Sequence, residues 1–218
     1  LAFSVEQIVT ALLGAVSALT VNFLFTPNHR KEVQQKLKAA EKGLHELIEM
    51  IIAKILDPIS DDQGFKEDVH ELRNLISSGL EVAKLLREEQ RFIIARETDS
   101  DIYRDAFRIY RSQMERLEEM HRLVRRMPIR VPQAEPIAQL FRVVRNMQLR
   151  HISGKTTLQD TVERIMEKLE HIFSEMDLPQ SREEFVSRAS LFHLFQEIQL
   201  YYRRNQKLPA NILLQKRR

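Results

Sequence analysis

Apolar residues recur at helical spacing along almost the whole chain, and this pattern predicts an all-α protein. Over residues 28–56 they return every three or four positions, which is the spacing of one buried helix face, as Val33, Leu37, Leu44, Leu47, Ile48, Ile51, Ile52 and Ile55. The same spacing predicts further amphipathic helices from about residue 69, 102, 137, 157 and 181. The polar stretch at 98–101 either caps a new helix or lies inside one longer helix.

Helices with a single apolar side bury that side most simply against one another. We therefore expect residues 28–218 to form one domain, an antiparallel bundle of about five to six amphipathic helices. The chain has only 5 glycines and 7 prolines, so it contains little of the turn chemistry that sheets need. Ser181 and Glu184 have the spacing of a capping box, which predicts the start of the last helix.

The N-terminal segment has a different pattern, with 18 consecutive uncharged residues at positions 8–25. An α-helix of that length covers about 27 Å, close to the thickness of a bilayer core. Every Lys and Arg follows Pro27, and five of them lie within residues 30–42. Positive charge flanking a membrane helix marks its cytoplasmic side. The pattern predicts a transmembrane helix over residues 1–27 and a cytoplasmic domain after it; the alternative is a buried helix of a soluble protein.

Small residues at four-residue spacing on this segment, among them Gly14 and Ala18, would allow another helix to approach closely in lipid. Asn22 adds an amide that needs a hydrogen-bond partner in hydrocarbon. The expected partners are therefore membrane lipid and other transmembrane helices, from the same protein or from a homo-oligomer.

Recognisable catalytic chemistry is missing from the sequence. It contains no cysteine and no phosphate-binding loop, nucleophile elbow or zinc-protease motif. We therefore expect a protein that is not an enzyme and that needs no cofactor or metal. His45 with Glu49, and His121 beside Glu118, have the spacing of metal pairs, but charged helices produce such pairs often, which favours solvated surface.

A basic stretch made of Arg122, Arg125, Arg126 and Arg130 is the candidate anion or lipid-headgroup patch. The alternative is a solvated helix end, where positive charge complements the helix dipole. The formal net charge is only +3, acidic residues are interleaved throughout, and the chain has no Trp, so we expect no nucleic-acid partner.

The segments 13–18 and 21–25, followed by Pro27, resemble the last membrane helix of the bacterial aromatic acid exporter family, within the fusaric-acid-resistance-like membrane proteins. The resemblance implies that the chain is the C-terminal part of a multi-pass protein of the cell membrane. The cytoplasmic domain would then be non-catalytic and serve assembly or regulation, and a small aromatic acid would be the substrate of the full-length protein. The alternative is a membrane-tethered helical adaptor or sensor that binds a protein partner.

Overall fold

A computed structural model describes residues 7–17, 29–90, 99–153, 158–209 and 212. All regular elements within these ranges are helices, so the all-α prediction is confirmed. Residues 7–17 are helical. The remaining helices are α2 (His29–Leu56), α3 (Phe65–Gln90), α4 (Asp99–Val124), α5 (Ala134–Ile152), α6 (Gln159–Glu175) and α7 (Arg182–Asn205). Of the two interpretations of residues 98–101, a helix beginning at Asp99 agrees with the structure.

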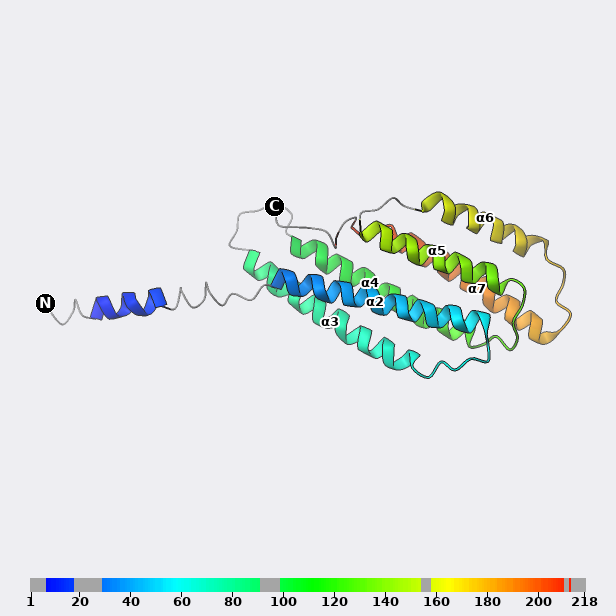
Figure 1. Ribbon diagram of the computed structural model, residues 1–218, viewed down its shortest axis with the longest axis horizontal. Coiled ribbons are helices and arrows are strands. Elements are labelled where there is room, and N and C mark those ends of the chain that lie inside the picture. Colours follow the sequence, from blue (N-terminus) through cyan, green and yellow to red (C-terminus); the bar gives the residue numbers. More distant parts are fainter. Residues whose placement is uncertain (1–6, 18–28, 91–98, 154–157, 210–211, 213–218) are drawn as a thin grey trace.

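Helices α2 to α7 form a bundle in which consecutive helices run antiparallel (Figure 1). Helices α2, α4, α5 and α7 surround the centre, since α2 packs on α4 and α5, and α7 packs on the same two helices. Helix α3 covers α2 and α4 from outside, and α6 packs on α5 at the opposite side of the bundle. The expected antiparallel bundle is therefore present.

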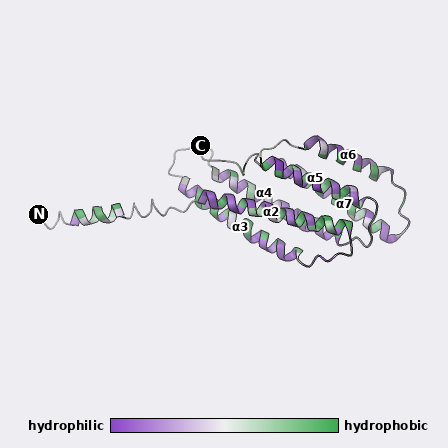
Figure 2. Cartoon of the chain, in the orientation of Figure 1, coloured by the Kyte–Doolittle hydropathy of each residue, from purple (hydrophilic) through white to green (hydrophobic). Residues whose placement is uncertain are grey.

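The predicted apolar stripe of α2 forms the middle of the core. All eight of its members are at most 2% exposed, because α2 has neighbours on three sides. Every helix of the bundle carries both hydrophobic and hydrophilic residues (Figure 2). Each helix is therefore held mainly by its buried face rather than by its own helical propensity.

The predicted start of the last helix is also confirmed. The backbone N–H of Glu184 donates to the hydroxyl of Ser181 at 3.0 Å, as an N-cap requires. The Glu184 carboxylate accepts from the backbone N–H of Gln180 at 2.8 Å, one residue before the usual capping-box partner. This hydrogen bond is the main reason why the pKa of Glu184 is lowered.

The apolar spacing that predicts the last helix consists of Phe185, Phe192, Phe195, Ile198 and Tyr202. Two of these residues are not in the core. Phe185 is 59% exposed and Phe192 is 43% exposed. Helix α7 turns Leu191, Leu194 and Ile198 toward the centre of the bundle instead. The Phe192 ring lies edge-on to Phe173 of α6 at 5.2 Å, so it covers the outer helix rather than filling the core.

Of the predicted membrane helix, the structure describes only residues 7–17. No helix within the described ranges is both long enough and apolar enough to cross a bilayer. Within 7–17, the side chains of Ile8, Leu12, Leu13 and Val16 are 57–63% exposed. A membrane-spanning helix over residues 1–27 therefore stays a prediction.

Candidate functional site

A cleft of about 540 Å³ opens on the surface between the first half of α3 and the last half of α4. We call it the α3–α4 cleft; it is lined by Phe65, Lys66, Val69, His70, Arg73, Glu118, His121, Arg122 and Arg125. Phe65, Val69 and His121 form its buried floor, each at most 6% exposed. The Phe65 and His121 rings stack in parallel with their centroids 3.6 Å apart. The charged side chains form its rim.

His121 is held at the floor of the cleft by Asp62, from the loop between α2 and α3. The distance from His121 Nε2 to Asp62 Oδ2 is 2.8 Å. Burial lowers the pKa of His121 below its usual value, and this effect outweighs the opposite influence of Asp62. Near neutral pH, His121 is therefore uncharged, and its Nε2 faces the Asp62 carboxylate.

The cations of the rim differ in their partners. Arg73 Nη2 lies 2.8 Å and 3.0 Å from the two carboxylate oxygens of Glu118. Arg122 pairs with Glu119 one turn before it, and Arg125 Nε lies 3.4 Å from Asp62 Oδ2. Lys66 has no carboxylate partner among the described residues. The rim therefore combines exposed ion pairs with one unpaired ammonium group.

The structure divides the predicted arginine patch into two parts. Arg122 and Arg125 line the α3–α4 cleft, whereas Arg126 and Arg130 do not, and Arg130 pairs with Glu135 at 3.3 Å. Lys66 and Arg73 of α3 lie beside Arg122 and Arg125 in the cleft. The spacing of residues along the sequence does not indicate this neighbourhood. The cleft adjoins the C-terminal end of α2. Because α2 has 28 residues, this end of the helix lies about 42 Å from residue 29. The role of the arginine patch in binding an anion or lipid headgroups stays a prediction.

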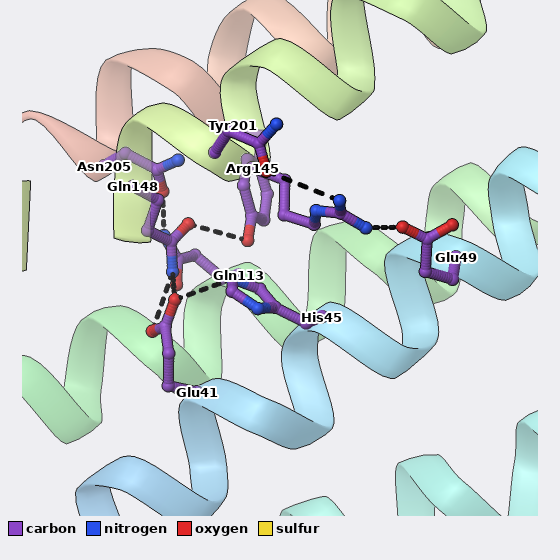
Figure 3. Close-up of polar contacts among 9 residues, drawn as sticks. Glu41, His45, Glu49, Gln113, Arg145, Gln148, Tyr201 and Asn205 are labelled. Atoms are coloured by element: carbon purple, nitrogen blue, oxygen red, sulfur yellow. Dashed lines mark hydrogen bonds and ion pairs between the residues drawn. The ribbon is translucent and has the colours of Figure 1, made fainter. Parts of the chain in front are cut away.

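A second group of polar side chains lies inside the bundle (Figure 3). We call it the buried polar cluster; its members are at most 3% exposed and come from α2, α4, α5 and α7, as Glu41, Tyr110, Gln113, Gln148, Tyr201 and Asn205. Gln148 Nε2 lies 3.0 Å from both oxygens of Glu41, and the Tyr201 hydroxyl donates to Gln148 Oε1 at 3.0 Å. Gln113 donates to Asn205. Four helices thus share one polar region.

The two tyrosines of this cluster are paired differently. The Tyr201 hydroxyl has its bond to Gln148, while the Tyr110 hydroxyl has no partner with hydrogen-bond geometry among the described residues. Burial raises the pKa of both tyrosines well above the usual value, and the negative charge of Glu41 raises it further. Both hydroxyls therefore stay protonated at every physiological pH.

The suggested metal pairs have other partners in the structure. His45 Nε2 lies 3.0 Å from Glu41 rather than facing Glu49, which pairs with Arg145 of α5. Within the described ranges, no group of three or more His, Asp or Glu side chains could hold a metal ion. The interpretation of His45 and Glu49 as a solvated pair was wrong in part, because His45 borders the buried polar cluster.

Of the predicted helix-packing residues, only Gly14 lies within the described residues; Ala18 and Asn22 lie outside them. A Cβ atom added at Gly14 would meet nothing within 4 Å. The described part of the chain therefore places no second helix against Gly14, and its packing role in a membrane stays a prediction.

Comparison with known proteins now gives the family. The family model for "Putative aromatic acid exporter C-terminal domain" matches residues 30–205, which is the extent of helices α2 to α7. The chain belongs to this family. The resemblance noted at residues 13–27 is therefore supported by an independent match to the domain that follows.

Two relatives extend the comparison. The chain is 29% identical over 199 residues to the uncharacterized protein YqjA of Bacillus subtilis, covering 89% of this chain and 56% of YqjA. It thus spans a little more than half the length of that relative. A crystal structure of a putative membrane protein from Clostridium difficile 630 is similar with a TM-score of 0.65 at 17% identity, over 81% of this chain and 96% of that one. At this identity the similarity shows the fold.

Proposed function

We propose that residues 28–218 form the cytoplasmic, non-catalytic domain of a membrane transporter, attached to the last of several membrane helices. The observation that carries the proposal is the family match over the whole bundle, residues 30–205. Exposed apolar side chains on residues 7–17 give further support, since lipid or other helices would cover them. YqjA is nearly twice as long as the region that aligns, which leaves room for further membrane helices.

The proposed role is assembly or regulation of the membrane part, and the proposed substrate of the full-length protein is a small aromatic acid. Transport needs a path enclosed by several helices, which a single helix cannot provide. The α3–α4 cleft and the buried polar cluster contain none of the nucleophile–base arrangements that catalysis requires. The bundle therefore acts through binding and packing in this proposal.

Topology is tested with a reporter fused after Arg218 in the full-length protein. The basic residues that follow Pro27 predict activity only for a reporter that works in the cytoplasm. A periplasmic reporter fused at the same position is the control. Activity of the periplasmic reporter would overturn the proposed orientation.

Transport is tested by the tolerance of cells to added aromatic acids, with wild type and Gly14→Leu at matched expression. Leu at position 14 should block close helix approach in the membrane and reduce tolerance. Because nothing lies within 4 Å of Gly14, the same change should leave the melting of the purified chain unaltered. Leu12→Ile is the control on the same helix. If gene deletion leaves tolerance to the tested acids unchanged, the transport proposal fails for those acids.

The second candidate is a membrane-tethered adaptor that binds a protein partner. The observation in its favour is a set of exposed apolar residues in the connections and the first turn of α7, with Ile59 89%, Leu178 88% and Phe185 59% exposed. A contiguous apolar patch on a surface marks contact with another protein, and the test asks whether these residues belong to one. A deletion with no transport phenotype, together with loss of a partner in Leu178→Ser, would favour this candidate.

A further inference from the structure

We propose that the α3–α4 cleft is a binding site for a small organic anion, held through a carboxylate or phosphate group by Lys66, Arg73 and Arg122. When no ligand is present, the Glu118 carboxylate pairs with the Arg73 guanidinium. The inference concerns the bundle alone and holds whether or not residues 1–27 span a membrane. Its first support is charge. Four permanent cations line the cleft, namely Lys66, Arg73, Arg122 and Arg125. Three carboxylates pair with the arginines, Glu118 within the lining and Asp62 and Glu119 beside it, so a positive charge remains on Lys66.

Two other clefts of the described structure have the opposite balance. A cleft of about 380 Å³ between α6 and α7 is lined by three glutamates and one arginine. A cleft of about 330 Å³ between α2 and α3 is lined by three carboxylates and one lysine. A surplus of positive charge is therefore a local property of the α3–α4 cleft and not of the surface in general.

The existing ion pairs in the cleft can be exchanged for a ligand. Arg73 and Glu118 are 51% and 32% exposed, and Arg122 and Glu119 are 66% and 34% exposed. Pairs this exposed contribute little to stability, so a ligand that replaces one of them loses little. Glu118 also shows how Arg73 binds an oxyanion, because both carboxylate oxygens of Glu118 contact one nitrogen of Arg73. A carboxylate or phosphate of a ligand presents the same oxygens.

The size and the floor of the cleft fit a ligand larger than the anionic group. A volume of about 540 Å³ lies within the range of small-molecule sites, about 300–1,000 Å³. The stacked rings of Phe65 and His121 make the floor rigid, and Val69 adds an apolar surface beside them. Asp62 Oδ2 lies 2.8 Å from His121 Nε2 and 3.4 Å from Arg125 Nε, so it contacts both the floor and the rim. The site is therefore formed before a ligand arrives.

The test uses the 218-residue chain purified in a neutral detergent, with benzoate and inorganic phosphate as probes. Melting temperature is followed by far-UV circular dichroism at increasing probe concentration, with sodium chloride of equal ionic strength as reference. A ligand that binds only the folded state raises the melting temperature, and the concentration dependence gives the affinity. Benzoate tests a carboxylate on an apolar body, and phosphate tests the other oxyanion. Stabilisation by either one supports the site and identifies its preferred group.

Substitutions inside and outside the cleft test where the probe binds. Lys66→Gln with Arg122→Gln should weaken binding about tenfold or more, since each removes a charge-assisted hydrogen bond. Lys38→Gln with Arg126→Gln makes the same charge change at exposed positions outside the cleft, and binding should stay within about twofold. Glu118→Gln should tighten binding by about fivefold, because it releases Arg73. The inference is overturned if neither probe stabilises the chain, if both double variants weaken binding equally, or if Glu118→Gln does not tighten it.

Discussion

The side-chain nitrogen of Gln148 on α5 lies 3.0 Å from each carboxylate oxygen of Glu41 on α2, inside the core of the bundle. Glu41 is 3% exposed and Gln148 is 1% exposed, so neither group can use water instead. Tyr201 of α7 donates to the other end of the same amide. Because a buried polar group without its partner is costly, this arrangement favours one register of α2, α5 and α7 over alternatives.

Replacing the carboxylate of Glu41 should therefore destabilise the bundle. In Glu41→Gln, an amide NH₂ must face the NH₂ of Gln148, and the contact of the carboxylate with His45 Nε2 is lost. We expect a loss of about 2–4 kcal/mol in the free energy of unfolding, measured with urea and circular dichroism. Glu46→Gln on the same helix is the control, because Glu46 is 55% exposed and should cost less than about 0.5 kcal/mol. Equal costs would contradict the importance of the buried polar cluster.

The two buried tyrosines should respond differently to loss of the hydroxyl. Tyr201→Phe removes the donor to Gln148 Oε1 and should cost about 1 kcal/mol. Tyr110→Phe removes a hydroxyl that lies near Glu41 but has no partner with hydrogen-bond geometry among the described residues, so it should cost less than Tyr201→Phe. Chemical unfolding of both variants, which differ from wild type by one oxygen atom, measures the difference. A larger loss in Tyr110→Phe would show that its hydroxyl has a partner after all.

The helices were predictable from sequence because each one has a periodic apolar stripe with proline or capping residues at its ends. The buried polar cluster was not predicted, although the sequence contains a signal for it. Glu41 lies four residues after Leu37 and three before Leu44, so it shares the apolar face of its helix. Gln148 has the same relationship to Val144. A polar residue in register with a stripe is a candidate for burial.

The α3–α4 cleft could be predicted only in part. Arg122 and Arg125 were found because they lie close together in the sequence, at the end of one helix. The contribution of Lys66 and Arg73 depends on which helix packs beside α4, and amphipathic stripes do not specify neighbours. Phe185 was misplaced for a related reason, since a stripe wider than the buried face extends onto the surface.

Gly79 permits the close packing of α3 on α4, and a larger residue there should be harmful. A Cβ atom at position 79 would lie 2.3–2.8 Å from ring atoms of Phe107, which is fully buried. We expect Gly79→Ala to cost about 2 kcal/mol, despite the higher helix propensity of alanine. At Gly43 the nearest atom is the flexible Cδ1 of Leu72 at 3.1 Å, so Gly43→Ala should be neutral or stabilising by up to about 1 kcal/mol. Thermal unfolding of the two variants tests this contrast.

The stability of the bundle should decrease on mild acidification because of His121. Burial lowers the pKa of His121 below 6.5 in the folded state, so the unfolded chain binds a proton more readily. The slope of the unfolding free energy with pH is then positive below about 6.5. The contribution is fully present above pH 6.5 and is lost as the pH falls through the folded pKa.

The measurement is the free energy of unfolding between pH 7.5 and pH 5 for wild type and His121→Gln. The variant loses the stack with Phe65 and the contact of Nε2 with Asp62, so it should be less stable at every pH. The decisive quantity is the slope, which should be shallower in His121→Gln because the titrating group is gone. His193→Gln, at an exposed position, should keep the slope of wild type. Identical slopes in all three proteins would show that His121 binds protons equally well in the folded and unfolded states.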